Sequence, residues 1–307
     1  MSKSNQVTTG ELDFKIPTLD IVAKTWYKVI GDLKSNRPLV ALHGGPGLNT
    51  EYLEILSNIT NAQSRALVLY DQIGNGRSTH LAHKKGDTSF WSENLFLTQL
   101  DELLEQLGIN DDYDLLGHSW GGMLAARHAT RQPKGLKRLV MFSSPASVDL
   151  WIETGHVYRK ELPQDVQDIL DKNENDGTIH SEEYRRAMKH YDSLHGCTIQ
   201  PVPEPIVKAL TCMMGDPTVR ESMYGPRHFE STGVLKNWTI IPDAHRISVS
   251  TLVLHGKVDQ ASRKTIEPLL KEIRTVESVE FEKSGHMAHF EETDKFMSVV
   301  GKFLSLA

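Results

Sequence analysis

Eight short segments of the chain have the hydrophobic pattern of β-strands. Residues 11–16 and 23–30 alternate between apolar and polar positions, as antiparallel strands do. Later segments, at residues 38–42, 66–70, 113–116, 136–142 and 251–255, are mostly continuous apolar runs of the kind found in buried parallel strands, and residues 278–281 alternate as a strand does. Helical patterns lie between them, and in residues 92–107 the leucines at 95, 100, 103, 104 and 107 share one face. This alternation predicts an α/β fold with a mostly parallel eight-stranded sheet and helices on both faces.

The alternation of strand and helix stops near residues 143–145 and resumes near residue 250. The intervening segment is rich in helix formers and turn breakers, including Pro-Val-Pro-Glu-Pro at 201–205. We therefore expect a core built from residues 1–145 and 246–307, with residues 146–245 inserted as a helical cap over the active site. The cap has 16 acidic and 10 basic residues. This excess could attract a substrate with a free amine, although a solvated helical surface explains it equally well.

A serine between glycines follows the strand predicted at 113–116. Residues 117–121 read Gly-His-Ser-Trp-Gly, and a helical pattern begins directly afterwards. A serine at a tight strand-to-helix turn is the nucleophile elbow of an α/β-hydrolase, and the flanking glycines are needed because a Cβ there would clash. We predict Ser119 as the nucleophile. Its position also predicts that the next N–H, that of Trp120, helps to hold an oxyanion.

A glycine-rich turn follows the strand predicted at 38–42. It reads His-Gly-Gly-Pro-Gly at residues 43–47. Glycines at such a place let a backbone N–H approach a substrate oxygen closely, as an oxyanion hole requires, and we assign the second N–H to Gly45. An ordinary Gly/Pro turn is the alternative, which the serine motif downstream disfavours.

An acid and a base follow the last two predicted strands. Asp259 lies in the loop after 251–255, and His286 lies after 278–281. The chain order Ser119, Asp259, His286 is the order that α/β-hydrolases use, so we predict these residues as the catalytic triad. Asp259 could also cap the helix expected after it. His289 is the competing base, but it lies one turn into the predicted last helix.

Composition and charge disfavour several classes of protein. The 307 residues carry a net charge of −6 with no basic patch that would suggest nucleic acid, and no apolar stretch is long enough to span a membrane. The start of the chain lacks the features of a signal peptide, and Cys197 and Cys212 form no disulfide framework or metal-ligand pattern. We expect a cytoplasmic protein that needs no metal or organic cofactor and acts on a small molecule or short peptide. Its oligomeric state is left open.

Over nearly its whole length the chain resembles the proline iminopeptidases of the α/β-hydrolase superfamily. The resemblance rests on the motifs at residues 43–47 and 117–122, on Tyr-Asp-Gln-Ile-Gly-Asn-Gly-Arg-Ser at 70–78, and on cap residues that include His195 and the Met-Tyr-Gly-Pro run at 223–226. It implies an aminopeptidase that works through an acyl-enzyme. Family members hold the substrate's amino group with two glutamates, one after the triad aspartate and one in a Gly-Pro-x-Glu-Phe segment.

Both of these glutamates are replaced here. Gln260 and His228 stand at the matching positions, and neither offers the charged acceptor that an ammonium group prefers. Glu204, Glu230 or Glu221 would have to substitute. Two other activities therefore stand beside that of an aminopeptidase or amino-acid amidase: an esterase or lactonase, and an acyltransferase, each acting on a small-molecule intermediate. A non-catalytic binding module is a more remote alternative.

Overall fold

An eight-stranded sheet forms the centre of the computed structural model, which describes residues 6–17, 19 and 21–305. The strands are Val7–Lys15 (β1), Val22–Ile30 (β2), Leu39–Leu42 (β3), Leu67–Tyr70 (β4), Tyr113–His118 (β5), Leu136–Phe142 (β6), Ser250–Gly256 (β7) and Val276–Phe281 (β8). They lie in the order β1-β2-β4-β3-β5-β6-β7-β8. Both pairs that involve β2 are antiparallel and all others are parallel, which confirms the predicted fold class.

The first strand is longer than the sequence pattern indicated. We expected it to begin at residue 11, whereas β1 begins at Val7 and pairs with β2 along its whole length, with Val7 opposite Ile30. Its side chains are mostly exposed at the edge of the sheet. Hydrophobic alternation reveals a strand only where one face is buried, so the exposed first residues carried no signal.

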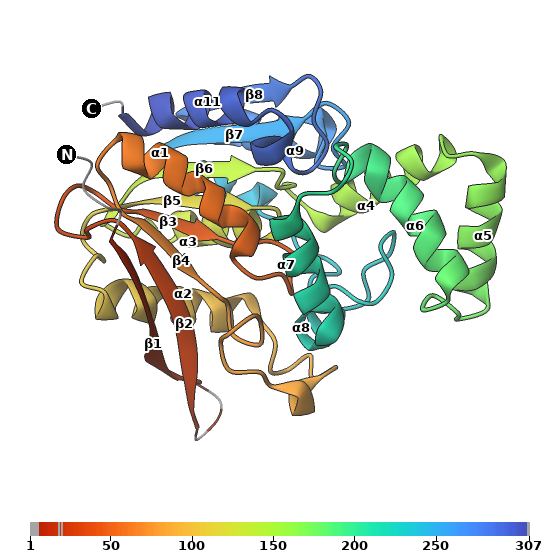
Figure 1. The fold of residues 1–307 in the computed structure, drawn as a ribbon, viewed down its shortest axis with the longest axis horizontal. Helices are drawn as coiled ribbons and strands as arrows, with labels where there is room; N and C mark the ends of the chain where they lie inside the picture. The colour runs from red at the N-terminus through yellow and green to blue at the C-terminus, as the bar shows by residue number, and fades with distance from the viewer. Residues whose placement is uncertain (1–5, 18, 20, 306–307) are drawn as a thin grey trace.

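Helices cover both faces of the sheet (Figure 1). Glu93–Gln106 (α2), Trp120–Thr130 (α3) and Arg263–Glu272 (α9) pack on one face, and Glu51–Leu56 (η1), Ser57–Ala62 (α1) and Thr293–Ser305 (α11) pack on the other. Short helices Ala82–Lys84 (η2) and Ala288–Glu291 (α10) lie in the connections. The predicted helix at 92–107 is α2. Ser92 begins it as N-cap, because its hydroxyl accepts a hydrogen bond from the Leu95 N–H.

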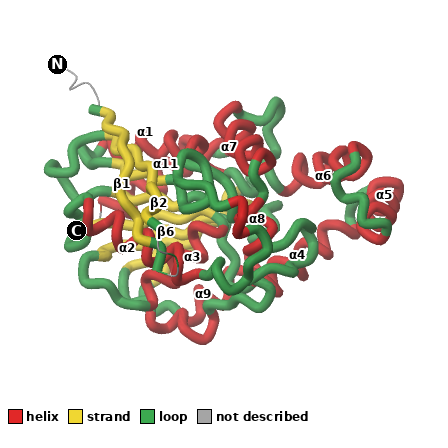
Figure 2. Tube along the Cα trace, turned by 90° about the horizontal axis from the view of Figure 1, so that it is seen from below, coloured by secondary structure: helices red, strands yellow, loops and turns green. Residues whose placement is uncertain are grey.

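The segment between β6 and β7, which we call the insertion, is helical. It contains Val148–Lys160 (α4), Gln164–Asn175 (α5), Glu182–His195 (α6), Glu204–Gly215 (α7), Thr218–Met223 (α8) and Ile241–Arg246 (η3). In Figures 1 and 2, α5 and α6 project away from the sheet, while α7 and α8 lie beside it. A small apolar cluster of its own, which includes Leu170, Tyr184 and Tyr191, packs the projecting part. That residues 146–245 form a separate domain stays a prediction.

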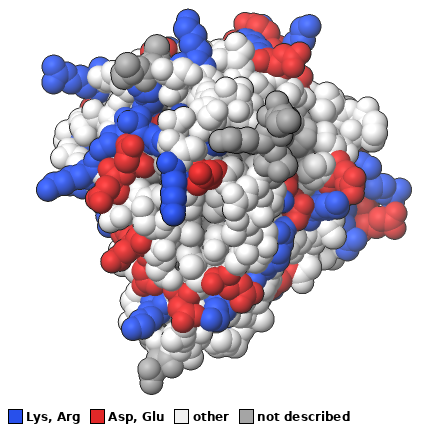
Figure 3. All heavy atoms as spheres, turned by 60° about the vertical axis from the view of Figure 1, so that its left-hand side comes forward, with Lys and Arg blue, Asp and Glu red and all other residues white. Residues whose placement is uncertain are grey.

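The surface carries charges of both signs. Figure 3 shows lysine and arginine side chains interspersed with acidic ones over the face that contains β1 and β2, where Lys24 pairs with Asp13 and Lys28 pairs with Glu54. No helix in the described ranges is long and apolar enough to cross a membrane.

Candidate active site

Ser119 lies at the turn between β5 and α3 in a strained conformation. Its φ of 53° and ψ of −122° are rare for a residue with a side chain. A Cβ added to Gly117 would come within 2.3 Å of the Gly121 carbonyl oxygen, and one on Gly121 within 2.2 Å of the Leu42 oxygen. The sequence Gly-x-Ser-x-Gly therefore folds into this turn because only glycines fit where β3, β5 and α3 meet.

We expect Gly117→Ala to lower the free energy of unfolding by about 2–4 kcal/mol, because the added methyl group overlaps backbone atoms that cannot move independently. Denaturant unfolding would measure this loss. Gly301→Ala in α11 is the matched control, since its Cβ would have no neighbour closer than 3.5 Å, and it should be neutral or stabilising. Equal stability of the two variants would contradict the steric explanation.

His286 and Asp259 are in direct contact. The ring Nδ1 of His286 donates a hydrogen bond of 2.8 Å to Asp259 Oδ1. His118, the neighbour of Ser119, lies against the same histidine, with its Nε2 3.0 Å from the His286 carbonyl oxygen. Ser119 and His286 are both partly exposed, whereas Asp259 is fully buried. The contact of His118 with His286 brings the turn after β5 to the loops after β7 and β8, while the assignment of the three residues as a catalytic triad stays a prediction.

The electrostatics of this pair favour a charged histidine. Burial acts to lower the pKa of His286, but the charge and hydrogen bond of Asp259, with smaller contributions from Glu291 and Asp192, raise it above its ordinary value. Burial acts to raise the pKa of Asp259, yet His286 lowers it below the ordinary value. An aspartate held ionised beside a histidine orients the ring and stabilises the imidazolium form.

His289, the competing base, is placed differently. It is buried in α10, where its Nε2 faces the Tyr52 carbonyl oxygen at 3.2 Å, and burial lowers its pKa to about 3. Asp259 does not cap the following helix either, because α9 begins at Arg263 with Ser262 as N-cap. Within the described part of the chain, no three His, Cys, Asp or Glu side chains form a group that could hold a metal ion.

The two N–H groups predicted for an oxyanion hole lie near the serine. A Cβ added to Gly44 would come within 3.0 Å of Ser119 Cβ, and the next residue, Gly45, has a φ of +117°. Within residues 6–17, 19 and 21–305, neither Gly45 N–H nor Trp120 N–H donates a hydrogen bond. Both donors are therefore available to a ligand.

Side-chain hydrogen bonds from residues 71 and 72 support this region. Gln72 accepts a hydrogen bond of 2.9 Å from the Trp120 indole, and its own N–H donates to His43 Nε2. The Asp71 carboxylate accepts from the Thr50 N–H at 3.0 Å and from the Arg77 N–H at 2.9 Å. These contacts hold the turns that carry Gly45 and Trp120.

Gln260 and His228 meet in a neutral hydrogen-bonded cluster. The Gln260 side-chain oxygen accepts from His228 Nε2 and from the Tyr191 hydroxyl, each at 2.7 Å, and its nitrogen donates to the Trp151 carbonyl oxygen at 2.8 Å. Burial lowers the pKa of His228 to about 4, and the positive charge of Arg220 adds to this effect. Both lone pairs of the amide oxygen are thus used, so the cluster offers an ammonium group no charged acceptor.

Three tryptophans differ in their exposure. Trp91 and Trp238 are buried among core residues, whereas Trp151 is partly exposed. The Trp151 ring lies 5.5 Å from that of His286 and 6.0 Å from that of His228. Trp151 therefore borders the site between the histidine and the neutral cluster.

The three glutamates suggested as substitutes are paired elsewhere. Glu204 is exposed on α7 and bonds Lys208, Glu230 bonds Arg227, and Glu221 bonds Lys85. Among the described residues, no hydrogen bond or ion pair joins Glu204 or Glu230 to Ser119, His286 or Gln260. A role for either in substrate binding stays a prediction that the geometry does not favour.

Two charged residues beside the site had no sequence signal. Asp192 in α6 has an exposed side chain, yet burial among surrounding atoms raises its pKa to about 6, and His286 acts in the opposite direction. Arg220 in α8 is partly exposed and influences the pKa of His228. Within the described ranges neither side chain forms an ion pair.

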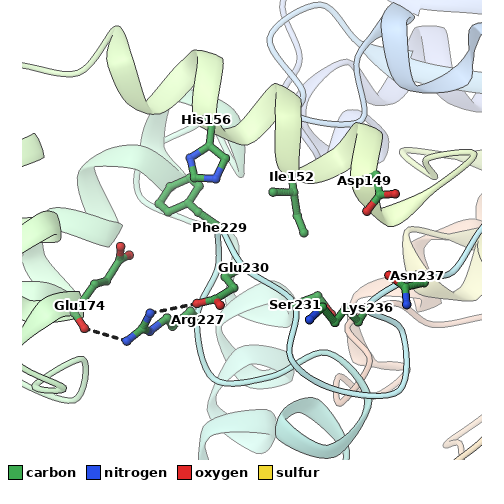
Figure 4. A pocket seen from close by; sticks show the side chains of 10 residues that line it. All are labelled: Asp149, Ile152, His156, Glu174, Arg227, Phe229, Glu230, Ser231, Lys236 and Asn237. Atoms are coloured by element: carbon green, nitrogen blue, oxygen red, sulfur yellow. Dashed lines mark hydrogen bonds and ion pairs between the residues drawn. The ribbon is translucent and has the colours of Figure 1, made fainter.

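A cavity of about 380 Å³ lies elsewhere in the insertion (Figure 4). It is lined by residues of α4 and α5 and of the segment after α8, namely Asp149, Ile152, His156, Glu174, Arg227, Phe229, Glu230, Ser231, Lys236 and Asn237. Arg227 reaches across it, donating to the Glu174 carbonyl oxygen and to the Glu230 carboxylate. None of the predicted catalytic residues lines it, so the chemistry of the site is not located there.

The same arrangement of elements occurs in known proteins. Residues 37–293 match the family model described as alpha/beta hydrolase fold. The chain is 34% identical over 279 residues to a proline iminopeptidase of Saccharolobus solfataricus, covering 91% of this chain and 88% of that protein. The crystal structure of VinJ superposes with a TM-score of 0.90 at 40% identity, covering 96% of this chain and 98% of VinJ. That of a Mycobacterium smegmatis proline iminopeptidase superposes with a TM-score of 0.86 at 34% identity, covering 96% and 97%.

Proposed function

This chain belongs to the proline iminopeptidase family of the α/β-hydrolase fold, and from that premise we propose that it hydrolyses an amide bond that follows an amino-terminal residue. It is a serine hydrolase. Its substrate in this proposal is a short peptide or an amino-acid amide. The observation that carries the proposal is the contact of His286 with Asp259 beside the strained Ser119 turn.

The proposed mechanism uses the residues in the order in which they meet the substrate. His286 Nε2 takes the proton of the Ser119 hydroxyl, and the serine oxygen attacks the carbonyl carbon. The N–H groups of Gly45 and Trp120 donate to the oxyanion, while Asp259 stabilises the imidazolium. The C–N bond then breaks as His286 gives its proton to the leaving amine, and the acyl-enzyme remains. In the second half His286 takes a proton from water, the water oxygen attacks the acyl carbon, and the proton returns to Ser119 as the acid leaves.

In this proposal Asp192 holds the substrate's amino group. It is an accessible carboxylate that interacts electrostatically with His286, and it forms no ion pair in the described chain. The neighbouring Tyr191 and Gln260 are neutral and bonded to each other, so they do not compete for the ammonium group. Asp192 would thus replace the charge that Gln260 and His228 lack.

The amino-group preference should depend on pH through Asp192. We expect the ratio of kcat/KM for alanine arylamide to that for propionyl arylamide, which lacks the amine, to fall as the pH decreases through about 6. Asp192 becomes neutral there, while the α-amine remains charged. Protonation of His286 slows both substrates equally, so it cancels in the ratio.

Asp192→Asn should lower this ratio about tenfold at neutral pH and remove its pH dependence, since a charge-assisted hydrogen bond is lost. Glu230→Gln is the matched control, because that carboxylate is paired with Arg227 at the other cavity. A ratio that is unchanged in Asp192→Asn would exclude Asp192 as the amine anchor.

One observation favours a second activity, the hydrolysis or transfer of an ester or lactone acyl group. The Gln260–His228 cluster is neutral and its amide oxygen is fully bonded, so this side of the site suits an uncharged substrate. The same serine chemistry hydrolyses esters. The leaving group of an ester is an alcohol, so no basic amine has to be protonated for it to leave.

Steady-state hydrolysis of proline arylamide, alanine arylamide and p-nitrophenyl acetate by the purified protein tests the proposal. Faster turnover of a free-amine arylamide than of its des-amino counterpart is the expected result. Turnover of the ester alone would reject the aminopeptidase activity and support the second candidate.

A further inference from the structure

Arg220 is a cation at the site that the proposed reaction does not use. Its Nη1 donates a hydrogen bond of 2.5 Å to the Gly225 carbonyl oxygen, and its guanidinium carbon lies 4.3 Å from the centre of the Tyr224 ring. In the part of the chain that the structure describes, Nε and Nη2 donate no hydrogen bond and no carboxylate pairs with the group. The edge of the guanidinium formed by Nε and Nη2, whose N–H groups point in parallel, is therefore free for a ligand.

The carboxylates nearest to Arg220 along the chain are already engaged. Glu221 pairs with Lys85 at 2.8 Å, and Asp216 pairs with His80. Burial lowers the pKa of Arg220, but the ordinary value is so high that the group stays charged. The negative charge of Glu221 acts on Arg220, but within the described residues no carboxylate forms an ion pair with it, so the accessible guanidinium points to a ligand that supplies the negative charge.

Arg220 and Ser119 lie against the same glycine-rich turn. A Cβ added to Gly47 would come within 3.1 Å of Arg220 Cβ, just as one on Gly44 would approach Ser119 Cβ. The glycine-rich turn at 44–47 thus lies between the serine and the arginine. This contact joins Arg220 to the loop that carries the Gly45 N–H.

A second set of contacts links Arg220 to the histidine side of the site. The Tyr224 hydroxyl, beneath the guanidinium, donates to the His228 carbonyl oxygen at 2.7 Å. Trp151 then lies between the rings of His228 and His286. Contacts therefore connect Arg220 to the turn beside Ser119 and, through Tyr224, His228 and Trp151, to His286.

We propose that Arg220 binds a carboxylate of the substrate through Nε and Nη2, so that the enzyme prefers amides that carry this group. The inference rests on the proposed function. Arginine binds carboxylates in a bidentate manner, which fixes orientation as well as charge. The carboxylate can belong to the leaving part, as in a dipeptide with a free carboxyl terminus, or to the side chain of the acyl part.

Two pairs of substrates distinguish these sources by kcat/KM. Alanyl-alanine is compared with alanyl-alanine amide for the leaving part, and glutamyl arylamide with glutaminyl arylamide for the acyl part. We expect the wild-type protein to prefer the carboxylate member of one pair at least about tenfold. Arg220→Gln should abolish the preference while the neutral member changes less than about threefold, and Arg220→Lys should retain part of it.

Arg227→Gln is the matched control, because Arg227 lines the separate cavity, and it should leave the preference intact. Equal losses for the charged and neutral members in Arg220→Gln would show a structural role and overturn the inference, as would a preference that survives the substitution. If Arg220→Gln does not fold, Arg220→Lys tests the inference instead. Bidentate binding requires the planar guanidinium, so a lysine variant that keeps the whole preference would contradict the inference.

Binding to Ser119→Ala, measured by calorimetry, separates this inference from the proposed function. Tighter binding of alanyl-alanine than of its amide, lost when Arg220→Gln is added, supports Arg220 even if no amide is hydrolysed. Hydrolysis of the neutral members with no charge preference in rate or binding rejects the role of Arg220 and leaves the proposed function standing.

Discussion

Replacing Ser119 with alanine is expected to lower kcat for amide hydrolysis by at least about 10⁴-fold. No other hydroxyl occupies the turn between β5 and α3, and the remaining oxyanion donors stabilise only a small residual reaction with water. The thermal midpoint should change little, because alanine inherits the same strained φ of 53° and removes no hydrogen bond of the hydroxyl in the described chain. Steady-state kinetics and thermal unfolding of the same preparation measure both effects.

The matched control is Ser35→Ala, which removes an exposed hydroxyl that bonds the Asp32 carbonyl oxygen far from the site. It should keep full activity. If Ser119→Ala retained more than about a hundredth of the wild-type kcat, the nucleophile would have to be another group and the acyl-enzyme at Ser119 would be rejected.

Asp259→Asn should lower kcat by about 10³–10⁴-fold, the second-largest effect we expect. The amide cannot stabilise the imidazolium, and it can turn its NH₂ group toward His286 Nδ1 and so favour the wrong tautomer. Asp259 also raises the pKa of His286. In the variant that pKa falls, so the acidic limb of the residual kcat/KM profile should shift to lower pH.

The shift of the acidic limb separates this role from a purely structural one. A variant that merely loosened the loop would lose activity without moving the limb. Asp243→Asn serves as control, because Asp243 lies in η3 and pairs with Arg127 of α3. This variant should change neither kcat nor the pH profile. An unshifted limb in Asp259→Asn would mean that another group sets the pKa of His286.

The sequence predicted the sheet and the meeting of Asp259 with His286 for a common physical reason. Buried parallel strands appear as apolar runs, and their carboxyl ends share one edge of the sheet, so residues directly after such runs come together. The order of the strands, in which β3 lies between β4 and β5, did not have to be predicted to expect this meeting of residues. Strand bounds were less certain at the exposed edge, where β1 lacks a buried face.

Asp192 and Arg220 could not be predicted, because nothing local marks a charged residue on a surface helix as facing the site. Which side of α6 or α8 faces the site depends on how the insertion packs on the core, and hydrophobic patterns do not specify that packing. The same limit explains why Glu204 and Glu230 looked equally good as amine partners. Their positions became distinguishable only through Lys208 and Arg227, which bind them.

The end of α6 is bound to the proposed base itself. The His286 N–H lies 2.8 Å from the Gly196 carbonyl oxygen and 3.1 Å from that of His195, and a Cβ added to Gly285 would come within 2.8 Å of the latter. An opening of the insertion as one rigid body would therefore have to break these hydrogen bonds or move His286 with it. An opening that leaves the reaction centre intact would bend the chain between α5 and His195, while the end of α6 stays bound to His286.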